Sequence, residues 1–290
     1  MARTLYEENF YASTDGLKLY YRLYPGDNTQ TPVLCLPALT RNSRDYHRLA
    51  THFSPHRKVV CPDLRGRGQS AWADKWESYE PTVYISDIVE LFRILEEQEW
   101  IVIGTSLGGI LAMILALSQP ESVKAVVLND IGSSIKREGY ERIAAYVGEF
   151  KPAKSWEEAE KNFKAAVSEV YPTLTSEEWS EFIRNTHREL LNGDIVPNYD
   201  PAIKTTFRQA LEVVPEGDIS LLAIFNGLLP KPAMVIRGET SDLLSRDTVK
   251  EMQTLKPDLR TLEIPKRGHA PLLTEEGCIA EIEDFINSAG

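Results

Sequence analysis

Short apolar runs without polar alternation recur along the chain and predict strands that are buried on both faces of a sheet. The clearest is Val33-Leu34-Cys35-Leu36, which lies between two prolines. Similar runs, the last of them more polar, follow at 58–61, 100–103, 125–128, 233–236 and 259–264. Residues 5–12 and 17–24 are joined by Thr14-Asp15-Gly16 and indicate a hairpin, which we expect at an antiparallel edge.

Segments with a helical period separate these runs. They lie at 45–53, 82–97, 107–118, 246–255 and 275–287. Segment 82–97, for example, places its aliphatic side chains on one face and its glutamates on the other. Strands that alternate with helices predict an α/β fold with right-handed crossovers. We therefore expect a mostly parallel sheet of about eight strands with helices on both faces.

Residues 135–229 break this alternation, because they contain helix-like segments and no convincing strand. The clearest helices are predicted at 156–171, 176–191 and 201–213. Ser155 and Thr175 are expected N-caps, the latter with Glu178 as a capping box. The pattern predicts a core domain of residues 1–134 and 230–290 with residues 135–229 as an inserted helical cap. Such a cap would lie over the C-terminal ends of the strands, where open α/β sheets bind ligands.

Composition and charge exclude several classes of partner. The 290 residues carry a net charge of −11, and such a surface repels nucleic acids and anionic membranes. The three cysteines are scattered and show no metal-ligand spacing, so we expect neither a disulfide framework nor a metal or other cofactor. Residues 1–8 lack the apolar stretch of a signal peptide, and no run approaches 18 apolar residues. A cytoplasmic monomer or homodimer is the expectation.

The strongest motif is Gly104-Thr105-Ser106-Leu107-Gly108, which follows a predicted buried strand and opens a predicted helix. This is G-x-S-x-G in the strand–turn–helix context of a nucleophile elbow. The glycines let the two backbones approach closely, and the serine is then forced outward beside a helix N-terminus. The pattern predicts Ser106 as a nucleophile and the N–H of Leu107 as an oxyanion donor.

Three more motifs accompany the elbow in a fixed order. Residues 62–70 match D-x-R-G-x-G-x-S, residues 237–242 end in Asp242, and residues 266–271 contain Gly268-His269. With these motifs the chain resembles the α/β-hydrolase superfamily over nearly its whole length, in particular serine-nucleophile esterase- or lactonase-like members with a helical cap. The resemblance implies Ser106 as nucleophile, Asp242 as acid and His269 as base, in the chain order this fold uses.

The histidine is better determined than the acid. His269 alone among five histidines lies in a glycine-containing loop between a late strand and the last helix, and a serine needs such a base within reach. We expect the other four histidines to lie on the surface or to have their hydrogen bonds satisfied within the fold: His47, His52, His56 and His187. Asp130, at the end of the strand after the elbow, is the alternative acid, and Glu239 is a weaker third candidate. Asp63 is expected to organise its own loop.

The loop after residues 32–36 departs from the family pattern. The family usually carries His-Gly there, whereas this chain has Pro37-Ala38-Leu39, and proline has no N–H to donate. We expect the N–H of Leu39 to be the second oxyanion donor. Further on, Arg41 or Arg44 could meet a substrate carboxylate. The alternative is a solvated loop in which Asp45 caps the following helix.

Seven aromatic residues in the predicted cap bear on the substrate. We expect most to pack the cap onto the core and some to line an apolar pocket: Tyr146, Phe150, Trp156, Phe163, Trp179, Phe182 and Phe207. The partner is then a small molecule with an apolar acyl chain or ring. The leading hypothesis is hydrolysis of a small carboxylic ester or lactone through an acyl-serine intermediate.

Other functions stay open on the sequence. A C–C bond hydrolase or a cofactor-free perhydrolase would use the same three residues, and a non-catalytic ligand receptor can share the fold. Haloalkane dehalogenase and epoxide hydrolase chemistry is disfavoured, because each needs a carboxylate nucleophile where Ser106 stands.

Overall fold

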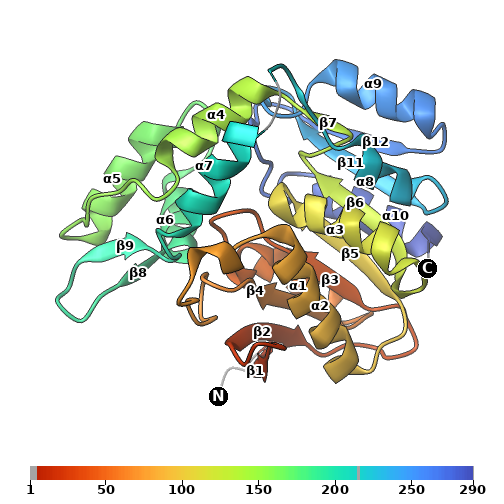
Figure 1. The fold of residues 1–290 in the computed structure, drawn as a ribbon, viewed down its shortest axis with the longest axis horizontal. Coiled ribbons are helices and arrows are strands. Elements are labelled where there is room, and N and C mark those ends of the chain that lie inside the picture. Colours follow the sequence, from red (N-terminus) through yellow and green to blue (C-terminus); the bar gives the residue numbers. More distant parts are fainter. Residues whose placement is uncertain (1–4, 214–215, 290) are drawn as a thin grey trace.

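The centre of the computed structural model is one eight-stranded sheet in the order β1-β2-β4-β3-β5-β6-β11-β12 (Figure 1). The structure describes residues 5–213 and 216–289; residues 1–4, part of the segment for which we predict no signal peptide, lie outside this range. β1 and β2 form an antiparallel hairpin, β2 pairs antiparallel with β4, and the other neighbouring strands are parallel. The bounds are β1 Glu7–Ala12, β2 Lys18–Tyr24, β3 Val33–Leu36, β4 Val59–Asp63, β5 Trp100–Thr105, β6 Val123–Asn129, β11 Ala233–Gly238 and β12 Arg260–Ile264. The predicted fold class is confirmed.

Helices bury both faces of this sheet. In β3, Val33 and Cys35 pack in one apolar cluster with helices α1 and α10, while Leu34 and Leu36 pack in another with α2, α3, α8 and α9. Successive side chains of a strand point to opposite faces, so a strand covered on both sides must be apolar at every position. The bounds are α1 His47–Phe53, α2 Pro81–Leu95, α3 Leu107–Ser118, α8 Leu222–Phe225, α9 Arg246–Leu255 and α10 Cys278–Ala289.

Short 3₁₀ segments complete the core connections. They are η1 Ser43–Tyr46, η2 Trp76–Ser78, η3 Pro120–Ser122 and η4 Asn226–Leu228. The first of them continues directly into α1, so the helix predicted at 45–53 begins with a tighter 3₁₀ turn.

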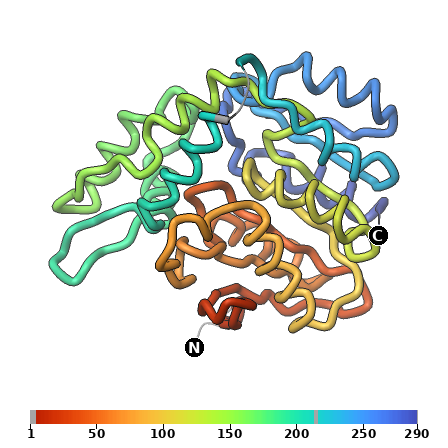
Figure 2. The backbone as a smooth tube through the Cα atoms, in the orientation of Figure 1, coloured from red at the N-terminus to blue at the C-terminus, as the bar shows by residue number. Residues whose placement is uncertain are grey.

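A helical layer projects to one side of the sheet, at the left of Figure 1. It consists of α4 Arg137–Tyr146, α5 Trp156–Val167, α6 Ser176–Thr186 and α7 Ile203–Val213, with the hairpin β8 His187–Glu189 and β9 Ile195–Pro197. The chain leaves the core after β6 and returns to it at α8, before β11, as Figure 1 and Figure 2 show. Two further short strands, β7 Ser134–Ile135 and β10 Ile219–Ser220, pair at the neck of this excursion. The exact bounds of the cap, 135–229, stay a prediction.

The β8–β9 hairpin corrects the expected helix at 176–191 and the expected absence of strands. Helix α6 ends at Thr186, whose hydroxyl bonds the carbonyl of Phe182 at 2.9 Å. The chain then turns back through Asn192-Gly193, with Gly193 at φ 84°. Such a turn favours glycine, and the isolated strands were too short to show an alternating pattern. The N-caps Ser155 and Thr175, the latter with the Glu178 capping box, are confirmed.

None of the helices within residues 5–213 and 216–289 is long and apolar enough to cross a membrane.

Candidate active site

The nucleophile elbow is built by close backbone packing at the end of β5. Ser106 has φ 52° and ψ −113°, a conformation that L-residues rarely adopt, and α3 begins at the next residue. A Cβ on Gly104 would lie 2.2 Å from the carbonyl oxygen of Gly108, and one on Gly108 would lie 2.0 Å from that of Leu36. Both glycines are therefore required for the turn to lie against the end of β3.

Ser106 and His269 meet across 163 residues of sequence. His269, in the loop after β12, has Nε2 2.8 Å from Ser106 Oγ and Nδ1 2.8 Å from Asp130 Oδ2. Asp130 is fully buried and Ser106 is 9% exposed. An ionised carboxylate can only accept, so Nδ1–H donates to Asp130 and Nε2 is left to accept from the serine hydroxyl. This is the proton arrangement in which an imidazole can act as a base toward a serine.

Asp130 is fixed by donors from the loop after β11. Besides His269, the Gly238 N–H donates to its Oδ1 at 2.8 Å and the Ser241 hydroxyl to its Oδ2 at 2.6 Å. Asp130 itself has φ 56°, and its N–H donates to Ile236 at 2.8 Å. Residues 237–242, which we expected to supply the acid, therefore supply the donors that hold Asp130, the acid that follows β6. Sequence reasoning singled out the next residue, Asp242, and missed Ser241.

The structure does not bring Asp242 to His269, which corrects the preferred acid. Its carboxylate pairs with Arg142 of α4 and is 41% exposed. Burial acts to raise the pKa of Asp242, but the hydrogen bonds and charge of Arg142 outweigh it and leave the pKa below its usual value. The loop turns after Gly238 so that Ser241 faces the core and Asp242 faces the cap. Glu239 instead accepts from the N–H of Lys266 at 2.8 Å.

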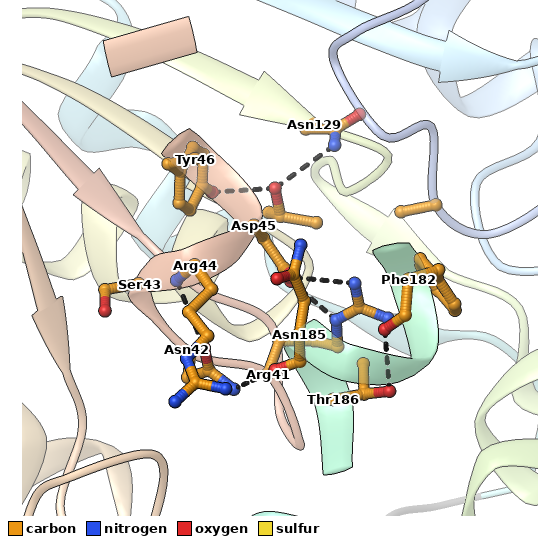
Figure 3. Close-up of polar contacts among 12 residues, drawn as sticks. Arg41, Asn42, Ser43, Arg44, Asp45, Tyr46, Asn129, Phe182, Asn185 and Thr186 are labelled. Atoms are coloured by element: carbon orange, nitrogen blue, oxygen red, sulfur yellow. Dashed lines mark hydrogen bonds and ion pairs between the residues drawn. The ribbon is translucent and has the colours of Figure 1, made fainter. Parts of the chain in front are cut away.

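A largely buried chain of hydrogen bonds joins Asn129 to Tyr46 (Figure 3). Asn129 Nδ2 donates to the carbonyl of Pro271, in the histidine loop, at 2.8 Å and to Thr105 Oγ1 at 3.1 Å. Thr105 lies 2.8 Å from the Tyr46 hydroxyl, which donates to the carbonyl of Leu36 at 2.7 Å. Since the tyrosine proton goes to Leu36, the threonine must donate to the tyrosine. The chain links the ends of β3, β5 and β6 to the histidine loop.

The two expected oxyanion donors follow strands β3 and β5. Leu107 is the first residue of α3, where backbone N–H groups have no partner within the helix. Leu39 lies in a turn closed by Arg41 N–H on Ala38 at 3.0 Å, and the fully buried Arg67 donates to its carbonyl at 2.8 Å. Both leucines line the cavity that contains Ser106 and His269. Their role as donors stays a prediction.

Asp63 organises its own loop, as expected. Its carboxylate accepts from the N–H groups of Ser43 at 2.7 Å and Gln69 at 2.8 Å. Burial raises its pKa despite these bonds. The other histidines also have structural positions; His187, for example, is buried and bonds Thr186 at 2.9 Å. Burial and the nearby charge of Arg41 lower the pKa of His187 to about 4.

A cavity of about 660 Å³ opens over Ser106 between the sheet and the cap helices. The seven cap aromatics correct the expectation that most of them pack the cap onto the core, because more of them line the cavity. Trp179 and Trp156 pack within the cap. Five line the cavity: Tyr146, Phe150, Phe163, Phe182 and Phe207. The site is therefore a roofed pocket with much apolar wall, which suits a small organic substrate.

The loop after β3 docks against the cap (Figure 3). Asn42 Nδ2 donates to the carbonyl of Asn185 at 2.7 Å, and Arg44 Nη1 to that of Arg184 at 3.0 Å. Asn42 also caps the helical segment that begins at Ser43, so the expectation that Asp45 caps it is wrong. Asp45 is instead paired with Arg41.

The family model described as alpha/beta hydrolase fold matches residues 31–276, a span that includes the elbow, Asp130 and His269. The chain belongs to the α/β-hydrolase family. This α/β-hydrolase is 33% identical to a 3-hydroxybutyrate-oligomer hydrolase of Cupriavidus necator, with 91% of each chain covered. It is 26% identical to a 2-(acetamidomethylene)succinate hydrolase of Mesorhizobium japonicum, with 88% of each covered. A crystal structure of an alpha/beta hydrolase from Novosphingobium aromaticivorans superposes with a TM-score of 0.93 at 36% identity, with 99% of each chain covered.

Proposed function

We propose that this α/β-hydrolase is a serine hydrolase that cleaves a small carboxylic ester or lactone through an acyl-Ser106 intermediate. The observation that carries the proposal is the hydrogen-bonded series Ser106–His269–Asp130, with 2.8 Å at each link, at a strained elbow that opens into the cavity. The relationship to the 3-hydroxybutyrate-oligomer hydrolase supports an ester as the substrate.

The geometry supports a two-step reaction. Ser106 Oγ attacks the carbonyl carbon while its proton passes to His269 Nε2, and the oxyanion forms beside the N–H groups of Leu39 and Leu107. The C–O bond breaks, and His269 returns the proton to the leaving alcohol. Water then adds to the acyl group, giving its proton to His269, and the acid leaves as the proton goes back to Ser106. Asp130 stabilises the imidazolium in both steps.

A serine-directed fluorophosphonate tests the nucleophile. We expect wild-type protein to be labelled once, at Ser106, and Ser106→Ala to remain unlabelled, because the alcohol activated by His269 is gone. Intact-mass spectrometry and peptide mapping measure both results. Wild-type protein that resists the probe, or Ser106→Ala that labels equally, would show that the proposal is wrong.

A substrate panel separates the ester reading from the alternatives. We expect turnover of short acyl esters and lactones by wild-type protein and none by Ser106→Ala. Turnover confined to a dioxo acid would identify a C–C bond hydrolase, and turnover confined to peracid formation a perhydrolase. Single-turnover behaviour with tight product retention would identify a receptor.

A further inference from the structure

The guanidinium of Arg41 lies in the wall of the cavity that contains Ser106. Its Nε and Nη2 face Asp45 at 2.5 and 2.7 Å, and its central carbon is 4.0 Å from the centroid of the Phe182 ring (Figure 3). The Asp45 carboxylate holds one edge of the guanidinium, and the Phe182 ring, which belongs to the cap, restricts the orientation of the guanidinium plane. Arg41 is therefore held in one orientation before any ligand binds.

One edge of this guanidinium is left for a ligand. Arginine presents its five N–H groups along two edges that each match a carboxylate. Asp45 takes the Nε–Nη2 edge. Within the described parts of the chain, Nη1 donates to no protein group, yet it is not among the buried polar atoms that lack a partner. The Nη1–Nη2 edge is thus accessible to the contents of the cavity.

Arg41 and the residues of the reaction centre line the same cavity. Leu39, the expected oxyanion donor, lies two residues before Arg41, so their Cα atoms are at most about 7 Å apart. The turn closed by the Arg41 N–H on Ala38 keeps the segment compact. An ester carbonyl at Ser106 and a charged group on the same small substrate can therefore be held at once.

The surrounding charges favour an anion. Among the charged residues that line the cavity, five are cations and four are anions, which leaves one positive charge: Arg41, Arg44, Arg48, Arg142 and Lys151 against Asp45, Glu149, Glu178 and Glu181. Burial of the Arg41–Asp45 pair in a largely apolar wall does not by itself stabilise the fold. The pair can instead serve binding, if a ligand supplies a negative charge that balances the positive excess.

Resting on the proposed function, we propose that Arg41 binds a free carboxylate of the substrate. The relationship to the 3-hydroxybutyrate-oligomer hydrolase then favours an ester of a short hydroxy acid whose own acid group is unesterified and leaves with the alcohol. Arg44 does not share this role, because its guanidinium is turned to the carbonyl of Arg184 at the end of α6.

Two substrates that differ only in charge test this assignment. 3-Butanoyloxybutanoate carries the free carboxylate, and its primary amide replaces that group with a neutral one of similar shape. Both release butanoate from the same acyl-enzyme, so kcat/KM is measured for both by butanoate release. The variants are Arg41→Gln, Arg41→Lys, which keeps the charge without the planar fork, and Arg44→Gln as the matched control.

We expect wild-type protein to prefer the acid, and Arg41→Gln to lower kcat/KM for the acid by about 10- to 100-fold. The amide should change by less than about threefold, Arg41→Lys should fall between, and Arg44→Gln should affect both substrates alike. Equal use of acid and amide by wild-type protein, or equal losses on both in Arg41→Gln, would overturn the assignment of Arg41 while the ester chemistry stands. If neither ester is cleaved and Ser106 resists the fluorophosphonate, the proposed function itself fails.

Discussion

The carboxylates of Asp130 and Asp242 have different environments, although each follows a buried strand. Asp130 is fully buried, and it accepts hydrogen bonds from a backbone N–H, a serine hydroxyl and the His269 imidazole. Asp242 is partly exposed and paired with a guanidinium. Only the first arrangement can fix the tautomer and the ring orientation of His269.

Asp130→Asn tests this difference. We expect kcat on a 4-nitrophenyl ester to fall by about 10³- to 10⁴-fold, because an amide at this position favours the wrong histidine tautomer. Asp242→Asn is the matched control and should stay within about threefold, since a partly exposed ion pair contributes less than about 1 kcal/mol. A loss in Asp242→Asn as large as that in Asp130→Asn would contradict the assignment of the acid.

At the scale of elements, the buried chain from Asn129 to Tyr46 ties three strand ends and the histidine loop together. Each of these segments carries one part of the site. Their relative placement depends on groups that contact no substrate, so Tyr46, Thr105 and Asn129 are positioning residues.

Tyr46→Phe should lower both the free energy of unfolding and kcat. The lost hydroxyl leaves the carbonyl of Leu36 and the Thr105 hydroxyl without this partner, which costs about 1–3 kcal/mol. We expect kcat to fall by about tenfold, because the oxyanion loop begins at Leu36. Urea unfolding and ester kinetics measure the two effects.

Tyr11→Phe is the control for that variant. It removes a buried hydroxyl that donates to the carbonyl of Asp87 at 3.2 Å, in the core away from the strand ends that carry the site. Its stability should fall comparably while kcat stays unchanged. If kcat falls equally in both variants, the effect is general destabilisation and Tyr46 has no positioning role.

Elements buried in the core were predictable, whereas the short strands of the cap were not. Helix α2 follows from its apolar periodicity, and strands β3 and β5 follow from unbroken apolar runs, because burial in the core requires these patterns in the local sequence. The end of α6 and the hairpin after it did not follow. His187–Glu189 is a three-residue strand whose pairing with Ile195–Pro197 depends on contacts within the folded cap.

At the scale of the whole molecule, the cap is joined to the loop that carries the oxyanion donor. Asn42 and Arg44 bind carbonyls in the last turn of α6, and Arg48 pairs with Glu181 of the same helix. Cations at a helix C-terminus also interact favourably with its dipole. This interface therefore links the position of the cap to that of the loop that carries Leu39.

Buried His187 in the cap makes stability depend on pH. Its folded pKa of about 4 lies below the unfolded value of 6.5, so its contribution is complete above pH 6.5 and is lost as the pH falls toward 4. In that window the unfolded chain binds a proton that the folded chain does not. Relative to His187→Gln, wild-type protein should lose about 3 kcal/mol of unfolding free energy between these pH values.

Urea unfolding at a series of pH values measures this difference. The exposed His56 provides the control, and His56→Gln should follow the wild-type curve throughout. Parallel curves for wild-type protein and His187→Gln would mean that His187 titrates alike in both states.

The alternating α/β fold, the elbow at Ser106 and the loop of His269 could all be predicted from the sequence. Unbroken apolar runs, glycines at a tight turn and the order of the motifs along the chain are properties of the sequence alone. The sequence favoured Asp242 over Asp130 as the acid, because both follow buried strands and Asp242 matched the commoner arrangement of the family. The folded structure selects Asp130 instead. The turn after Gly238 directs the Ser241 hydroxyl and the Gly238 N–H at Asp130, and it places Asp242 beside Arg142 of the cap. The packing of two loops more than 100 residues apart in sequence decides which carboxylate contacts the imidazole. A local sequence pattern contains no information about that packing.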